Sequence, residues 1–117
     1  MTMVQVAEGR SLFAEQNQCS VKFGLGRIEV EFAGLDKLNS LQWLLHSREQ
    51  ATGSDGGEVI IRRHQGFCQV ELRRGRMVEE CRLDRIEFDW FVGEVAMDIA
   101  FARSCPAGRP IITDPDD

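Results

Sequence analysis

Apolar and polar residues alternate from Glu58 to Leu83, and the pairs Gln65-Gly66 and Arg74-Gly75 interrupt the alternation. A period of two predicts β-strands, because successive side chains of a strand point to opposite faces. Glycine at the second loop position can take the positive φ that tight hairpin turns require. The pattern therefore predicts a three-stranded meander with strands Glu58–His64, Phe67–Arg73 and Arg76–Leu83.

Two-residue loops at both turns place most of the apolar side chains on one face of this meander. That face carries Val59, Ile61, Arg63, Cys68, Val70, Leu72, Met77, Glu79, Cys81 and Leu83. The other face is mostly polar, as expected for an antiparallel sheet with one packed and one solvated face. We expect the exceptions Arg63 and Glu79 to lie near a sheet end or to pair with another group. This register also puts Cys68 directly opposite Cys81.

The first half of the chain has the same two-residue period. Met3–Ala7 predicts an edge strand, and Ser11–Gln16 fits either a second strand or a helical turn. Two further strands, Cys19–Gly24 and Arg27–Phe32, predict a hairpin about Leu25-Gly26. In that hairpin Val21 faces Val30, Phe23 faces Ile28, Cys19 faces Phe32, and Lys22 faces Glu29.

Two segments have a helical period. The leucines of Leu35–Ala51 recur every three or four residues and form one apolar stripe. Asp84 followed by Glu87 is a capping box that predicts the start of a second helix, which should end near Ser104 because Pro106 cannot continue it. The apolar residues of the second helix occupy more than one stripe, so we expect it to be covered on more than one side. They are Ile86, Phe88, Trp90, Phe91, Val92, Val95, Met97, Ile99 and Phe101.

These elements predict an α+β fold with a single antiparallel sheet of five or six strands. The order is hairpin, helix, three-strand meander, helix, and both helices pack on one face of the sheet. The glycine-rich stretch 52–57 is expected to be a flexible surface loop between the first helix and the meander. A chain of 117 residues has the size of one domain. We therefore assign residues 1–105 to a single domain and residues 106–117 to a C-terminal tail that is partly disordered.

Charge and cysteine content narrow the function classes. The net charge of −5 disfavours non-specific binding of nucleic acid, because an acidic protein repels phosphate. The N-terminal residues show no basic region followed by an apolar run, and no stretch is long and apolar enough to span a membrane. The four cysteines contain no C-x-x-C pair, which favours free thiols in a reducing compartment. A cytoplasmic protein is expected.

Candidate chemistry is sparse. Cys68, Cys81 and His64 are the groups that a pocket between sheet and helices would use, as an enzyme or a small-ligand site. His64 lies on the opposite face of the predicted sheet from Cys68, which argues against a catalytic pair. No catalytic, cofactor or metal motif is visible, so we expect no enzymatic activity, no cofactor and no metal. Nucleic-acid binding through Arg73, Arg74 and Arg76 is a further alternative.

The sequence favours a small protein-binding domain of an adaptor, chaperone-like or inhibitor-like (immunity-like) kind. Recognition of a protein partner is expected to use one of two surfaces, and a homodimer is one form of this hypothesis. The aromatic C-terminal helix contributes more aromatic side chains than one packed stripe can hide. The arginine-bearing strand face offers guanidinium groups that bind carboxylates. The predicted partner-binding residues are Trp90, Phe91, Phe101, Arg62, Arg73, Arg74 and Arg76.

Overall fold

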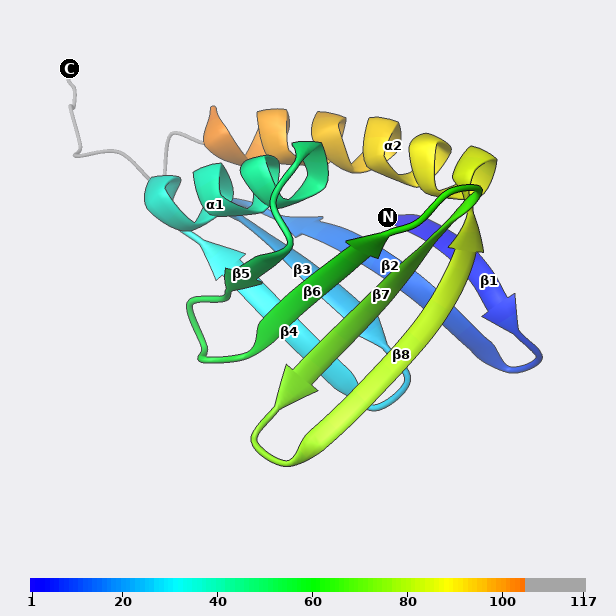
Figure 1. The fold of residues 1–117 in the computed structure, drawn as a ribbon. Helices are drawn as coiled ribbons and strands as arrows, with labels where there is room; N and C mark the ends of the chain where they lie inside the picture. The colour runs from blue at the N-terminus through cyan, green and yellow to red at the C-terminus, as the bar shows by residue number, and fades with distance from the viewer. Residues whose placement is uncertain (105–117) are drawn as a thin grey trace, which may run out of the picture.

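The computed structural model describes residues 1–104, which fold into eight strands and two helices. The first antiparallel sheet has the order β1 (Thr2–Ala7), β2 (Arg10–Asn17), β3 (Ser20–Leu25), β4 (Ile28–Ala33), and α1 (Leu35–His46) follows it. The second has the order β5 (Gln50–Thr52), β6 (Glu58–Arg63), β7 (Phe67–Arg74), β8 (Met77–Asp84), and α2 (Arg85–Arg103) follows it. Four antiparallel strands and a helix therefore occur twice in the same order (Figure 1). The predicted tail, 106–117, lies outside the described residues.

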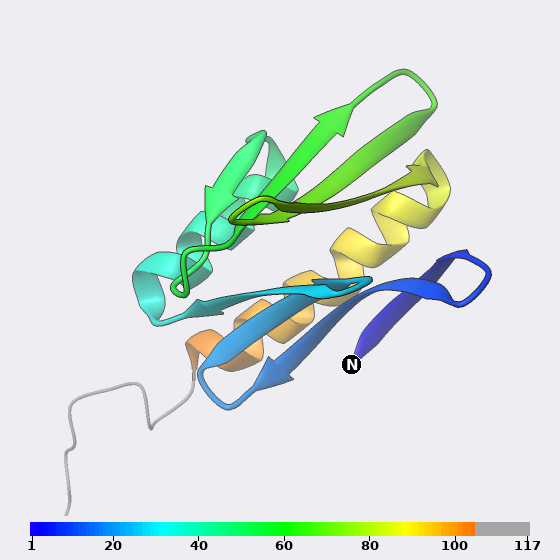
Figure 2. The same ribbon diagram turned by 90° about the horizontal axis from the view of Figure 1, so that it is seen from below.

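The two sheets and the helix pair surround one core. In Figure 1 the second sheet lies in front of the first, and α1 and α2 lie side by side along the upper end of both sheets. Figure 2, seen from below, shows α2 in the opening between the two sheets. Contacts agree with this view, since α2 touches β1, β2 and β3 of one sheet and β7 and β8 of the other. The largest fully buried side chains come from every layer: Phe23, Phe32, Phe91, Leu12, Leu25, Ile28, Leu38, Leu41, Leu44, Ile61, Leu72 and Leu83.

The predicted α+β class is confirmed, whereas the predicted single sheet of five or six strands is wrong. The edge strand near residues 3–7 is present, residues 11–16 form a strand rather than a helical turn, and β5 was not predicted. The helices do not cover one face of one sheet, because α1 contacts β4 and β5 while α2 contacts both sheets. Alternation shows which side chains point inward. It does not show whether a second sheet or a helix lies opposite them.

The register of the meander is confirmed at one turn and wrong at the other. Strands β6 and β7 pair as predicted, with Arg63 opposite Cys68. Strands β7 and β8 are displaced by two residues, so that Cys68 faces Leu83 and not Cys81. The β3–β4 hairpin shows the same displacement, since Val21 faces Phe32 and not Val30.

Both displacements have the same cause. The two-residue loops are Gly26-Arg27 and Gly75-Arg76, with glycine in the first position, whereas the prediction put glycine in the second position. Gly26 and Gly75 each have φ of 60°, and Gln18 alone among the described non-glycine residues has positive φ. A two-residue loop with positive φ at its first position only is a type II′ turn. A displacement of two residues leaves every side chain on its predicted face, whereas a displacement of one would have reversed the faces.

The first helix is shorter than predicted, because it ends at His46 and the chain then pairs with β6 as strand β5. The Arg63 guanidinium lies at the C-terminal end of this helix. It donates hydrogen bonds to the carbonyls of Leu44 (2.6 Å), Leu45 (3.1 Å) and Arg48 (2.8 Å). The expectation that Arg63 pairs with another group is therefore confirmed. It is also confirmed for Glu79, whose carboxylate lies 2.8 Å from the Arg10 guanidinium.

The loop between β5 and β6 is tied to the edge of β4. Ser54 donates its backbone N–H to the Glu31 carbonyl at 2.7 Å and accepts from the Ala33 N–H at 3.0 Å. Asp55 accepts from the Glu31 N–H at 3.2 Å. A side chain at Gly53 would meet the Glu31 carbonyl oxygen at 2.6 Å, so glycine is required for this approach. The loop predicted to be flexible thus covers an edge strand and connects the two sheets.

Candidate functional site

Apolar side chains occupy two opposite sides of α2. The capping box of Asp84 and Glu87 fixes the start of this helix as predicted, and Ser104 follows its last turn. One side is buried against the sheets and carries Phe88, Phe91, Val95, Ile99 and Ala102. The opposite side is exposed, with Ile86 at 82%, Trp90 at 51%, Met97 at 58% and Phe101 at 62% of full accessibility. These four residues are spaced by 4, 7 and 4 positions, which places them in one line along a helix. We call this line the α2 ridge.

The exposed ridge differs from the expectation that α2 is covered on more than one side. Within residues 1–104 only the inner stripe is covered. Trp90 and Phe101 lie on the ridge, but Phe91 is 1% exposed and contacts Phe23 edge-to-face with ring centroids 5.7 Å apart. Phe91 is therefore a core residue and is not part of the candidate binding surface. Ile86 and Met97 belong to the candidate binding surface, although they were not predicted for it. Their spacing of four and seven residues from Trp90 was the sequence signal that could have identified them.

Acidic side chains follow the ridge on the side toward β1. Glu87, Glu94 and Asp98 form no ion pair within the described part of the chain. Asp98 accepts a hydrogen bond from the Thr2 hydroxyl at 3.2 Å, which places this side next to the N-terminal strand. Gly93 lies in the middle of the ridge, and a methyl group added there would meet no atom within 4 Å. The ridge is therefore an apolar line with a gap at its centre and negative charge along one flank.

The other flank of the ridge faces α1 across a shallow hollow of about 430 Å³. It is lined by Asn39, Gln42, Trp43, His46 and Arg103. Arg103 donates to the Gln42 side-chain carbonyl at 2.5 Å, which links the two helices. Trp43 is half exposed and contacts His46 edge-to-face with centroids 6.3 Å apart. Trp43 extends the apolar surface of the helix pair beyond α2.

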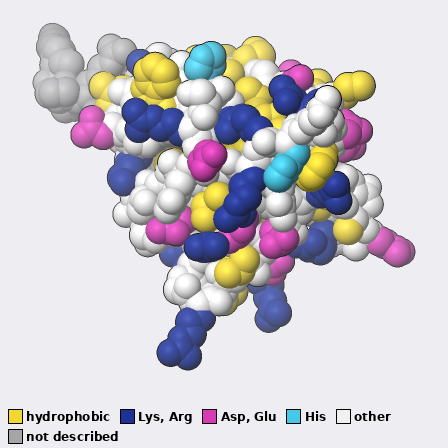
Figure 3. Space-filling view, viewed as in Figure 1, with side chains coloured by type: hydrophobic (Ala, Val, Ile, Leu, Met, Phe, Trp, Pro, Cys, Tyr) yellow, Lys and Arg dark blue, Asp and Glu magenta, His cyan; other side chains and the backbone are white. Residues whose placement is uncertain are grey.

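The arginines predicted on the strand face are largely paired. Arg62 and Arg73 lie on the outer face of the second sheet and both bind the Glu71 carboxylate, at 2.8 Å in the case of Arg62. Glu71 is only 5% exposed, so its charge is held between these two guanidiniums. Figure 3 shows the result on this face, where basic and acidic side chains are interspersed while hydrophobic ones gather along the upper edge over the helices. The face presents a mixed surface and not a basic one.

Pairing with Arg62 and Arg73 predicts an acid-dependent loss of stability. The hydrogen bond from Arg62 is the main cause that lowers the pKa of Glu71 from its ordinary 4.5; burial opposes it and Arg73 adds to it. A carboxyl group with a lower pKa in the folded state stabilises fully above the unfolded pKa, and the contribution disappears as pH falls through the folded pKa. We expect the free energy of unfolding to fall more steeply below about pH 4.5 in the native chain than in Glu71→Gln.

Urea titrations at a series of pH values measure this difference. Glu8→Gln is the matched control, because Glu8 is exposed in the β1–β2 turn. Parallel pH profiles for the native chain and Glu71→Gln would show that the two arginines do not stabilise the charged form of Glu71.

Arg74 and Arg76 lie apart from this pair. Arg74 binds the Asp55 carboxylate of the β5–β6 loop at 2.7 Å and reaches the Glu29 carbonyl on β4 of the first sheet. Arg76 is exposed in the β7–β8 turn and forms no ion pair with any residue that the structure describes. The structure therefore does not bring Arg62, Arg73, Arg74 and Arg76 into one basic cluster.

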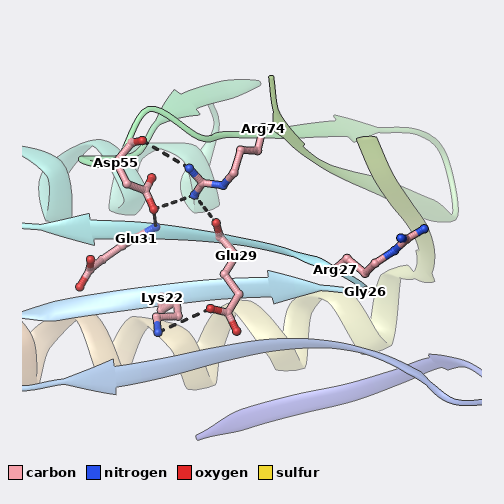
Figure 4. A pocket seen from close by; sticks show the side chains of 7 residues that line it. All are labelled: Lys22, Gly26, Arg27, Glu29, Glu31, Asp55 and Arg74. Atoms are coloured by element: carbon pink, nitrogen blue, oxygen red, sulfur yellow. Dashed lines mark hydrogen bonds and ion pairs between the residues drawn. The ribbon is translucent and has the colours of Figure 1, made fainter. Parts of the chain in front are cut away.

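Arg74 lines a second hollow of about 430 Å³ between the two sheets. Its lining residues, shown in Figure 4, are Lys22, Gly26, Arg27, Glu29, Glu31, Asp55 and Arg74. Lys22 and Glu29 lie 3.6 Å apart. Burial raises the pKa of Asp55, but the hydrogen bond from Arg74 and those from the N–H groups of Gly57 and Glu31 outweigh it and lower the pKa below 3.8. Lys22 is thus paired with Glu29 within the first sheet, and Arg74 is paired with Asp55 of the β5–β6 loop.

His64 and the cysteines do not form a site together. His64 stacks on Phe67 with centroids 4.5 Å apart, and the Arg82 guanidinium carbon lies 3.7 Å from the centre of the same ring. Cys68 and Cys81 are buried free thiols on the opposite face of the sheet. The prediction that they face each other is wrong, since Cys81 is opposite Val70. Cys19 is disulfide-bonded, so the prediction of free thiols is wrong at that position. No group of three or more potential metal ligands occurs among residues 1–104.

Burial makes both free thiols poor nucleophiles. Desolvation raises the pKa of Cys81 to about 11, and it also raises the pKa of Cys68. Because the thiolate is the reactive form, roughly a thousandth of Cys81 is ionised near pH 8. We expect both residues to react with a thiol reagent at least about a hundredfold more slowly in the folded chain than in denaturant. Mass-resolved labelling at pH 8 measures this ratio. Fast labelling of Cys68 in the folded chain would return it to the candidate reactive groups.

Neither helix of the described chain is both long and apolar enough to cross a membrane. In comparisons with protein-family models, curated proteins and solved structures, nothing matches this chain significantly.

Proposed function

We propose that this chain is a protein-binding domain without catalytic activity, which recognises a protein partner through the α2 ridge. The observation that carries the proposal is the line of Ile86, Trp90, Met97 and Phe101, each more than half exposed on the side of α2 that faces away from the core. Removal of apolar surface from water contributes about 25 cal/mol per Å², so a partner gains free energy by covering these side chains. Tryptophan is also enriched among the residues that dominate binding energy.

The scaffold supports such a role because it holds the ridge rigid. The inner stripe of α2 packs against both sheets, and the helix start is fixed by the capping box of Asp84 and Glu87. The four side chains are thus presented on a helix that is ordered before any partner binds. Binding to a preformed surface avoids the entropy of ordering a flexible segment.

The alternative functions find less support in the same residues. Arg62, Arg73 and Arg74 are each engaged by a carboxylate of this chain, so a carboxylate or phosphate partner would have to displace Glu71 or Asp55. Cys68 and Cys81 are buried with raised pKa values. Neither of the two hollows described above is lined by Cys68, Cys81 or His64, the groups predicted for a small-ligand or catalytic site.

Affinity capture with a matched pair of baits tests the proposal. The native chain, the ridge variant Trp90→Ser/Phe101→Ser and the control Arg76→Ser are immobilised and exposed to an extract of the native host. We expect proteins that bind the native chain and Arg76→Ser but are lost from the ridge variant. The leading protein is then purified and titrated, and its affinity should fall about a hundredfold in the ridge variant.

Circular dichroism melts of the three baits establish that each is folded. A purified partner that binds the native chain and the ridge variant equally would overturn the assignment of the α2 ridge. Loss of binding in Arg76→Ser alone would assign recognition to the strand face.

A further inference from the structure

We propose that the partner of the α2 ridge is an amphipathic α-helix with Lys and Arg side chains beside its apolar stripe. This inference rests on the proposed function and names the chemistry of the partner. The partner helix lies along α2, with its apolar stripe on the ridge and its cations against the acidic flank.

The spacing of the exposed side of α2 favours a helical partner. Ile86, Trp90, Gly93, Met97 and Ala100 are all exposed and are separated by four, three, four and three residues. This alternation is the seam of a coiled coil, in which each side chain of one helix fits between four of the other. The seam with Phe101 beside it extends about 22 Å, the length of four helical turns. A partner of matching shape is a straight helix of similar length.

Gly93 at the centre of the seam lets a second helix approach closely. Glycine in a helix interior is less favourable than alanine, so a glycine there calls for a reason. Within residues 1–104 none is apparent, because a side chain at Gly93 would meet no atom within 4 Å and its φ is not positive. A large side chain of the partner can fill the gap between Trp90 and Met97.

The charge beside the seam specifies a basic partner. Glu87 and Glu94 occupy the positions that flank the seam, where coiled coils form interhelical ion pairs, and Asp98 lies on the same side. None of the three is neutralised by an ion pair within the described chain. A helix with Lys or Arg at its matching flank positions supplies the missing counter-charges, and the net charge of −5 also attracts it.

The same charges disfavour a second copy of this chain as the occupant. In an antiparallel pair the flank bearing Glu87 and Glu94 would face its own copy. In a parallel pair Asp89 on the other flank would face Glu94 of the second copy. Both arrangements bring like charges together, which suppresses pairing. The homodimer considered from the sequence is therefore not the favoured occupant.

Two synthetic peptides of about three heptads test the inference. Both carry Leu along the seam; one has Lys at the flanking positions and the other has Glu. Fluorescence anisotropy of the labelled peptides is measured against the native chain. We expect the basic peptide to bind at least about tenfold more tightly than the acidic one, and this preference to decrease as salt is raised from about 50 to about 300 mM.

Charge reversal on α2 distinguishes the effect of the flank carboxylates on peptide binding from the effect of the net charge of the chain. In Glu94→Lys/Asp98→Lys, which leaves the capping box of Asp84 and Glu87 intact, we expect the preference to reverse toward the acidic peptide. Glu8→Lys/Glu49→Lys is the matched control, since it changes the net charge equally at exposed positions away from α2, and it should keep the basic preference. Gly93→Leu should weaken binding of the basic peptide about tenfold without unfolding the chain.

The outcomes distinguish this inference from the proposed function. Equal binding of both peptides, or loss of the preference in the control variant, overturns the basic-helix partner. A concentration-dependent dimer of the native chain in sedimentation, abolished in Trp90→Ser/Phe101→Ser, makes a second copy the occupant and also overturns it. In either case a ridge-dependent partner from affinity capture leaves the proposed function intact, whereas a ridge-independent partner removes both.

Discussion

Phe91→Ala is expected to lower the free energy of unfolding by about 3–5 kcal/mol, the range for removal of a large buried aromatic side chain. Phe91 is fully buried and contacts Phe23, so its removal opens a cavity where α2 packs on the first sheet. Urea denaturation of the native chain and the variant, followed by circular dichroism, measures the change. We expect an unchanged m-value, because the loss of one side chain does not alter the surface exposed on unfolding.

Trp90→Ala is the matched control for this prediction. The two aromatic residues are neighbours in the same helix, but Trp90 is half exposed on the ridge. Its substitution should change stability by less than about 1 kcal/mol. Equal destabilisation by both substitutions would mean that Trp90 is covered in the folded chain, and the α2 ridge would not exist as a free surface.

The second large effect is expected at Arg63. Its guanidinium donates to three carbonyls at and beyond the end of α1 and lies 5.7 Å from the Phe88 ring centre, measured from its carbon. Arg63→Ala leaves these carbonyls without their donor and removes a cation from the negative end of a helix. We expect a loss of about 2–4 kcal/mol in the free energy of unfolding, measured by urea denaturation.

Arg63→Lys separates charge from geometry. A lysine keeps the cation but lacks the planar fork of donors, so we expect it to recover no more than about half of the loss. Arg76→Ala serves as the control, because Arg76 is exposed and should change stability by less than about 0.5 kcal/mol. If Arg63→Ala were as mild as this control, the guanidinium would not be holding the α1 end.

The exposed position of the α2 ridge follows from the way the two halves of the chain pack together. Each half supplies a four-stranded sheet with one apolar face, and neither sheet can bury that face alone. Packing the two faces together leaves an open end that the helix pair fills (Figure 1). Each helix therefore buries one stripe and keeps the opposite side outward, and in α2 that outward side is apolar.

The candidate site was predictable only in part. The excess of apolar residues in α2 indicated that the helix carries two stripes, and Trp90 and Phe101 lie on its exposed side. Phe91 was misplaced and Ile86 and Met97 were not selected, because both stripes contain aromatic and aliphatic residues. Sequence alone cannot show which of two similar stripes the sheets will cover.

The sequence by itself determined the alternation of inward and outward side chains, the capped start of α2 and the α+β class. These follow from local geometry, since a two-residue period, a capping box and a glycine turn act within a few residues. The two-sheet arrangement, the pairing of Arg62 and Arg73 with Glu71, the role of Arg63 at α1 and the free side of α2 were decided by the tertiary structure. Each depends on which surfaces meet across the core. That choice is made by the packing of distant segments and leaves no local period in the chain.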